Sequence, residues 1–205
     1  MNAADKLVEL FSKFPGIGPR QSKRFVYFLL TRNQQFVEEL ATLLLELRKE
    51  RAICSSCARF FVSPSSKSLL CEICRSERRT NDTLVIVEKD VDLENVERSG
   101  AFKGKYFVLG GTIPLLEKEP GNKIRLKQLL RTIGERSKSG LKEIILALSA
   151  TPEGENTEFY LRQELEAITK RGGIKLSVLG RGLSTGAELE YLDPDTIKNA
   201  LQNRH

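Results

Sequence analysis

The four cysteines of this 205-residue chain fall in two C-x-x-C pairs, Cys54 with Cys57 and Cys71 with Cys74, and 13 residues separate the pairs. A C-x-x-C turn directs two thiolates at one point, and two such turns close a tetrahedron around zinc. Two disulfides would need an oxidising compartment, and a redox site would need only one pair beside a helix N-terminus. We therefore predict a structural zinc site with no open coordination position, so that the metal organises the fold without catalysing a reaction.

Basic residues surround the cysteines and dominate the first two-fifths of the chain. Residues 1–83 hold 14 basic and 9 acidic side chains, whereas the remaining 122 residues are nearly neutral. A polyanion would bind in the basic part, although an ordinary solvated surface has the same composition. The basic side chains near the cysteines are expected to offset the negative charge of four thiolates on zinc; they are Arg51, Arg59, Lys67, Arg75, Arg78 and Arg79.

A glycine turn, Pro15-Gly16-Ile17-Gly18-Pro19, is followed by Arg20, Lys23 and Arg24. Between two helices this pattern indicates a helix-hairpin-helix. Its glycines let a phosphate approach the backbone, and the next helix presents free N–H groups. Such contacts follow the DNA backbone without reading its sequence. The alternative is an αα-hairpin whose glycines only permit a tight turn. We favour phosphate binding by Gly16, Gly18 and the three basic side chains.

Two acidic segments follow predicted strands. Glu88 ends the segment Val85-Ile86-Val87, and the loop 149–155 carries Glu153 and Glu155. A strand-end glutamate facing a second acidic loop resembles the Mg²⁺ site of toprim domains. Toprim enzymes carry a D-x-D pair in that loop, but Ser149 and Thr151 occupy those places here. Hydroxyls are poor ligands for two-metal chemistry, so a toprim scaffold without turnover is the better interpretation.

Three helices are predicted before the cysteines. Apolar residues recur at helical spacing over 7–14, the glycine turn ends this helix, and the spacing resumes over 20–30. We expect Phe25 and Phe28 to lie in the core. A third helix, over about 34–51, is predicted to bury Val37, Leu40, Leu44 and Leu47.

After residue 83 the pattern becomes α/β. Strands alternating with helices predict a mainly parallel sheet with right-handed crossovers. Strands are expected at 84–87, 106–109, 143–148 and 174–179, and helices at about 123–138 and 157–170. A loop and a last short helix complete the chain. No apolar run is long enough to span a bilayer, and residues 1–10 resemble neither a signal nor a transit peptide. We expect a soluble, cytoplasmic protein. The only histidine is His205, so imidazole chemistry is close to excluded.

The order of these parts resembles the RecR family of recombination mediators over nearly the whole chain. The resemblance includes the glycine turn, the cysteines, Gly104–Leu109, Thr151–Glu155 and the tail motif Gly182–Glu190. It implies an α+β multi-domain protein. The expected domains are a helix-hairpin-helix at 1–52, a four-cysteine zinc module (zinc finger) at 53–80, a toprim domain at 81–179 and an oligomer-contacting tail at 180–205.

The same resemblance implies a DNA-binding protein of recombinational repair that does not cut DNA. Such proteins form homodimers or ring-like homotetramers and act with RecO and RecF to load RecA. By motif, Lys23 and Arg24 fall near the DNA-contacting positions, and Glu88, Glu153 and Glu155 fall in the acidic region that also serves partner contacts. An active Mg²⁺-dependent toprim nuclease or primase-like enzyme is the alternative, and a scaffold that never touches nucleic acid is a third possibility.

Overall fold

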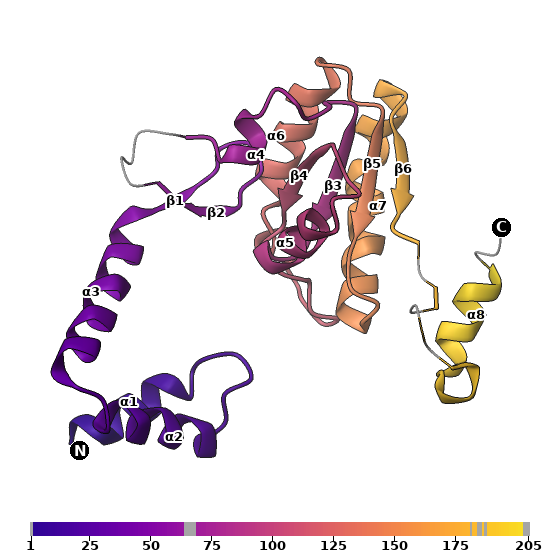
Figure 1. Ribbon diagram of the computed structural model, residues 1–205. Coiled ribbons are helices and arrows are strands. Elements are labelled where there is room, and N and C mark those ends of the chain that lie inside the picture. The colour runs from indigo at the N-terminus through magenta and orange to yellow at the C-terminus, as the bar shows by residue number, and fades with distance from the viewer. Residues whose placement is uncertain (1, 64–68, 181, 184–185, 187, 203–205) are drawn as a thin grey trace. The chain divides into compact units, whose positions relative to one another are not determined.

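The computed structural model describes residues 2–63, 69–180, 182–183, 186 and 188–202 (Figure 1). The chain forms two compact units, residues 1–51 with 62–66 and residues 52–61 with 67–205. Some predicted positions lie outside the described residues; they are Lys67 and, in the tail motif, 184–185 and 187.

The first unit contains the three predicted helices, α1 (Ala3–Phe11), α2 (Pro19–Leu30) and α3 (Gln34–Glu50). The side chain of Asn2 caps α1 by accepting a hydrogen bond of 2.9 Å from the Asp5 backbone N–H. The Phe11 ring packs edge-on against the Phe25 ring at 5.7 Å. Because α1 ends at Phe11, Phe14 lies in the turn and is 53% exposed instead of continuing the apolar stripe.

Helix α3 differs from the prediction in its burial. None of its residues is buried, and its apolar side chains are exposed to between 36% and 74%. The expectation that Val37, Leu40, Leu44 and Leu47 belong to a core is therefore wrong for the single chain. Phe28, which is 45% exposed beneath the Arg32 guanidinium, is not a core residue either. Helical spacing identifies an apolar face but not what covers it.

The second unit is built on a four-stranded parallel sheet with the order β4-β3-β5-β6. All four predicted strands are confirmed. The aligned register brings Val87, Val108 and Ala147 to the same edge, so the loops after these strands lie close together. The strands are β3 (Thr83–Val87), β4 (Lys105–Val108), β5 (Glu143–Ala147) and β6 (Lys175–Val178).

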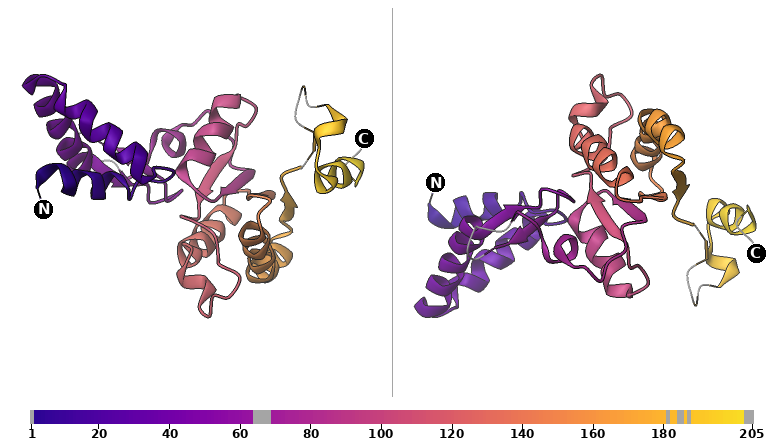
Figure 2. Two further views of the ribbon diagram at one scale, coloured as in Figure 1. Left: turned by 90° about the horizontal axis from the view of Figure 1, so that it is seen from below. Right: turned by 90° about the horizontal axis from the view of Figure 1, so that it is seen from above.

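Helices cover both faces of this sheet (Figures 1 and 2). On one face α6 (Leu126–Ser137) and α7 (Pro152–Gly172) bury Leu84, Ile86 and Phe107. On the other face α5 (Asp90–Ser99) packs on the remaining strand residues through Leu93. Because the strands are covered on both sides, they read as continuous apolar runs. Helix α5 was absent from the sequence prediction because its ten residues hold few apolar side chains.

Short elements complete the described chain. Two of them, β1 (Arg51–Ile53) and β2 (Phe60–Val62), pair in a small sheet, and α4 (Glu72–Arg75) carries the second cysteine pair. The tail contains a 3₁₀ turn (Leu189–Tyr191) and the predicted last helix, α8 (Pro194–Gln202). Another 3₁₀ turn (Pro120–Asn122) precedes α6. No helix in the described part of the chain has the length and apolarity that crossing a membrane requires.

A polar network ties the cysteine segment to the sheet face covered by α5. The Arg79 guanidinium forms an ion pair with Glu97 of α5 and also donates to the carbonyls of Phe102 and Gly104. The Tyr106 hydroxyl donates to the same carboxylate at 2.5 Å. Burial acts to raise the pKa of Glu97, but the hydrogen bonds from Arg79 and Tyr106 outweigh it and hold the pKa below its ordinary value.

The lowered pKa of Glu97 makes the stability of this network depend on pH. A carboxyl group whose pKa is lowered on folding contributes stability above its unfolded pKa of about 4.3, and this stability disappears as the pH falls through the folded pKa. We expect Glu97→Gln to unfold at a lower urea concentration at pH 7, because its free energy of unfolding falls by roughly 1.5–3 kcal/mol. Between pH 6 and 3 the variant should lose less stability than the parent. Glu94→Gln, on the same helix but exposed, is the control. If both variants lost the same stability between pH 6 and 3, Glu97 would not be the source of the pH dependence.

Candidate metal centre and nucleic-acid interface

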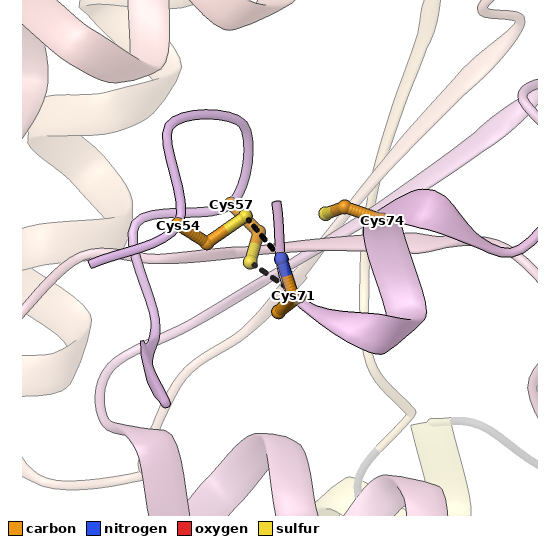
Figure 3. Close-up of side chains that lie close together, drawn as sticks. All are labelled: Cys54, Cys57, Cys71 and Cys74. Carbon is orange, nitrogen blue, oxygen red and sulfur yellow. Dashed lines mark hydrogen bonds between the residues drawn. The ribbon is translucent and has the colours of Figure 1, made fainter. Parts of the chain in front are cut away.

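The four cysteines converge as the spacing predicts (Figure 3). Their sulfur atoms all lie within 4.8 Å of one another, and the Sγ atoms of Cys57 and Cys71 are 3.6 Å apart. A zinc ion with four sulfurs at about 2.3 Å requires sulfur atoms about 3.8 Å apart. All four are free thiols, and three of them are fully buried. The donor set and its dimensions therefore fit a tetrahedral metal ion.

The crowding couples the protonation of the four thiols. The hydrogen bond with Cys57 lowers the pKa of Cys54, and the same contact raises the pKa of Cys57. A buried cluster of this kind cannot carry four thiolates unless a cation compensates them. A divalent metal ion supplies that compensation, and its binding releases the protons.

The first cysteine turn is docked on the sheet edge and on α6. The Val108 N–H of the edge strand β4 donates to the Cys57 carbonyl at 2.8 Å. The Arg125 guanidinium donates to the Ala58 carbonyl at 2.6 Å, and the Thr132 hydroxyl to the Ser56 carbonyl at 3.2 Å. Ala58 has a φ of 62°, which turns the chain back toward the sheet immediately after the metal ligand.

The second cysteine turn is held by one side chain of the same edge strand. Lys105, only 4% exposed, donates from Nζ to the carbonyls of Ile73, Cys74 and Ser76 at 2.8–3.1 Å. These carbonyls close the C-terminal end of α4, where a cation is favourable. Burial lowers the pKa of the Lys105 ammonium. Both cysteine turns are thus fastened to the parallel sheet by polar contacts.

The glycine turn of the first unit has the geometry expected of a hairpin. Gly16 has a φ of 75°, a conformation that favours glycine, and Gly18 begins α2 without any side-chain cap. Pro19, which has no N–H, occupies the first helical position, and the first N–H groups of a helix have no partner within it. Arg20, Lys23 and Arg24 are all exposed on α2. The structure places the five predicted residues on one short segment, with a helix N-terminus and three cations.

The acidic strand end has a different arrangement from a metal cage. Glu88 is 6% exposed, and its Oε1 accepts hydrogen bonds from the Ser149 N–H at 2.6 Å and the Ser149 hydroxyl at 2.7 Å. The Ser149 hydroxyl lies 3.0 Å from that of Thr151, which in turn caps α7. Ser149, at the place of one expected aspartate, therefore holds Glu88 within the protein, and Thr151, at the place of the other, contacts Ser149.

Glu153 and Glu155 do not lie in a loop as predicted, because α7 begins at Pro152 and both occupy its first turn. Acidic side chains there complement the positive end of the helix. Among the described residues, the cysteines are the only group of three or more potential ligands close enough to hold a metal ion. The structure does not gather Glu88, Glu153 and Glu155 into such a group.

A parallel sheet with a glutamate after its first strand, preceded by a four-cysteine centre and a helical hairpin, defines a toprim-type protein with an appended helical module. Residues 82–180 match the toprim domain family, residues 4–48 match the RecR helix-hairpin-helix family, and residues 182–205 match the RecR C-terminal family.

Curated relatives named recombination protein RecR extend over the whole chain. The protein from Bdellovibrio bacteriovorus is 34% identical over 100% of this chain and 97% of its own length. Those from Cereibacter sphaeroides and Bacteroides thetaiotaomicron are each 36% identical over 98% of this chain and over 94% and 92% of their own lengths. The chain belongs to the RecR family, and the resemblance noted in the sequence is confirmed.

Sequence reasoning missed the residues that fasten the cysteine turns. All four lie 30 or more residues beyond the last cysteine: Lys105 just before the strand predicted at 106–109, and Arg125, Thr132 and Arg136 in the helix predicted at about 123–138. One signal was available for Lys105, because a lysine opening an otherwise apolar buried strand needs a polar partner.

Proposed function

We propose that this protein is a non-enzymatic, DNA-binding mediator of recombinational repair that acts as a homodimer or homotetramer. In this proposal it works with RecO and RecF to help load RecA, and a zinc ion occupies the four-cysteine centre. The observation that carries the proposal is the combination of a cationic hairpin with a toprim strand end whose glutamate is bound by the N–H and the hydroxyl of Ser149. Full-length similarity to proteins named recombination protein RecR supports the same role.

The DNA contact is proposed at the start of α2. Gly16 and Gly18 leave the backbone open, since an added Cβ at either position would meet nothing within 4 Å. A phosphate could therefore approach the N–H groups of α2 closely, with Arg20, Lys23 and Arg24 adding charge. Contacts of this type are made to the sugar–phosphate backbone, so we expect binding without sequence preference.

The oligomer is proposed from helix α3. Its exposed side chains include three consecutive leucines, Leu43, Leu44 and Leu45, at 54%, 57% and 74%. Burying such a face gains about 25 cal/mol for each Å² removed from water, so an apolar helix of this length favours association. A second copy of the same chain is the proposed partner, because a two-fold symmetric interface buries the same face of both copies.

The acidic strand end is proposed as a site of partner contact. Glu153 and Glu155 lie on the first turn of α7, beside the loop that holds Glu88. Because Glu88 is bound by Ser149, we expect the toprim region not to hydrolyse DNA. The negative charge of this edge would complement a basic surface on RecO or RecF.

The DNA proposal is tested by removing two cations from α2. We expect Lys23→Ala/Arg24→Ala to weaken binding of a labelled oligonucleotide and to reduce the slope of log affinity against log salt by about 2, one unit for each phosphate that is no longer neutralised. The control Lys127→Ala/Lys138→Ala removes the same charge from α6 and the residue that follows it. A slope that changes equally in both double variants would mean that only net charge matters.

The same preparation separates the proposed mediator from an enzyme. Incubation of the parent protein with a labelled duplex and Mg²⁺ is expected to leave the DNA intact. Cleavage that depends on Mg²⁺ and disappears in Glu88→Ala would establish a toprim nuclease instead. Failure of the parent protein to bind DNA at low salt would leave only a protein scaffold.

The oligomer prediction concerns the solution mass. We expect Leu44→Glu/Leu47→Glu to reduce the mass measured by light scattering to that of one chain, 23.1 kDa. Two carboxylates on an apolar interface remain solvated only if the copies separate. Thr42→Glu, which adds charge to an exposed polar position of α3, is the matched control. A parent protein of 23.1 kDa at micromolar concentration would rule the proposed assembly out.

A further inference from the structure

Lys105 is a buried cation for which the described part of the chain shows no carboxylate within ion-pair distance. Its ammonium binds three backbone carbonyls, which satisfy its hydrogen bonds but carry no full charge. Burying an ammonium without an opposite charge is strongly unfavourable. A source of negative charge is therefore expected nearby, and the sulfur ligand Cys74 belongs to the segment that Lys105 binds.

Arg136 of α6 binds the other cysteine turn in a comparable way. Its guanidinium donates to the Ser56 hydroxyl at 2.9 Å, whereas its Nε is buried without a hydrogen-bond partner among the described residues. Arg136, Lys105 and Cys74 line one cleft of about 220 Å³. Glu135 also lines this cleft, but its carboxylate pairs with Arg131 at 3.4 Å.

The charges balance when the metal is considered. Four thiolates around a divalent ion carry two negative charges, and Lys105 and Arg136 supply two positive ones. Of the basic residues expected from the sequence to do this, Arg59 and Arg79 pair with Glu94 and Glu97 instead. Each of the two cations comes from a different toprim element, and each fastens a different cysteine turn.

We propose that Lys105 and Arg136 are the outer-sphere partners of the metal centre, which neutralise its thiolates and set its affinity from within the toprim domain. This inference rests on the proposed zinc site. Both are positioning residues: they act through Cys74 and Ser56 without touching the metal. Groups that orient and polarise metal ligands change metal affinity by about 10–100-fold when they are removed.

We do not propose that the cleft binds an anion from solution. An anion would lie beside the Cys74 thiolate and the Glu135 carboxylate, and both would repel it. The two cations already face negative charge from the protein once the metal is bound, so they would have little affinity left for phosphate.

The experiment measures zinc affinity of the full-length protein by competition with a chelating dye. We expect Lys105→Met and Arg136→Met each to bind zinc about 10–100-fold more weakly than the parent, whereas Lys105→Arg restores most of the affinity. Lys103→Met and Lys138→Met remove exposed cations next to the same elements and are expected to stay within about twofold. If the parent takes up no zinc, the zinc proposal fails; if it binds zinc and both Met variants bind equally well, this inference fails.

Cobalt substitution distinguishes charge compensation from mere folding. In the Co²⁺-loaded protein, loss of a cation beside the thiolates makes them more electron-rich, so the sulfur-to-metal charge-transfer band moves to longer wavelength in both Met variants. A purely structural role leaves the band of the loaded protein unchanged, and that result would overturn the proposal. Stabilisation of the parent by millimolar phosphate that disappears in Lys105→Met would overturn it as well.

Discussion

Removal of the metal is expected to unfold residues 52–80 and to lower the melting temperature of the toprim sheet without unfolding it. In the described part of this segment the cysteines form a small cluster with Phe61, Leu70 and Ile73, which are only partly buried, whereas Ala58 packs with the larger core of the sheet. Binding of a metal ion, worth about 10–16 kcal/mol for structural zinc in small motifs, is therefore expected to be the main source of order in this segment. The sheet keeps two apolar clusters of its own, one on each face.

Hydrogen exchange gives this prediction a specific readout. The Val108 N–H donates to the Cys57 carbonyl at the sheet edge, so its protection should disappear when the metal is chelated. The Leu109 N–H, which donates to the Val87 carbonyl inside the sheet, should stay protected. Adding zinc back, but not Mg²⁺, should restore the first signal. An unchanged exchange pattern and melting curve after complete metal removal would refute the structural role.

Substitution of Gly154 is expected to destabilise the toprim domain strongly. A Cβ at this position would overlap the Ser149 carbonyl oxygen and lie 2.6 Å from the Ser149 hydroxyl. Ser149 is held in place by Glu88 through both its N–H and its hydroxyl, so it cannot give way cheaply. We expect Gly154→Ala to cost about 1–3 kcal/mol in urea unfolding, the range of an overpacked core. The displaced Ser149 would also release Glu88.

Gly134→Ala is the matched control for this experiment. Gly134 lies inside α6, and an added Cβ there would meet nothing within 4 Å. Alanine is favoured over glycine in a helix by about 0.5–1 kcal/mol, so the control should be more stable than the parent. Two alanine substitutions in one domain are therefore expected to have opposite signs. Equal stability of Gly154→Ala and the parent would show that the α7 start is not packed as described.

The sequence predicts the parallel sheet well because its strands are short apolar runs between glycines and charged residues. The run Val85-Ile86-Val87 favours a buried strand because it is short and all three residues are β-branched. The cysteine cluster is equally predictable, since the spacing of the ligands determines its geometry.

The sequence places the start of α7 at residue 157, whereas the helix begins at Pro152. Thr151 and Pro152 form an N-cap and a first helical residue, but the acidic residues after them resemble a loop by composition. The burial of α3 was predicted wrongly for a different reason, because its periodicity does not say whether the apolar face packs on the same chain.

The local sequence pattern does not identify the partners of Lys105 and Arg136. These contacts join residues separated by about 30 and 80 positions, and they depend on how the cysteine turns dock against β4 and α6. Tertiary docking of this kind leaves a weak signal in sequence, namely a polar side chain where the pattern calls for an apolar one.

The docking of the first cysteine turn on β4 has a consequence for solubility. β4 is the outer strand of the sheet, and an outer strand with free N–H and C=O groups is a template for strand addition by another chain. The Cys57 carbonyl occupies one of these groups as long as the turn is in place. A chain that lost the metal and with it this turn would expose an unpaired strand edge, which favours aggregation.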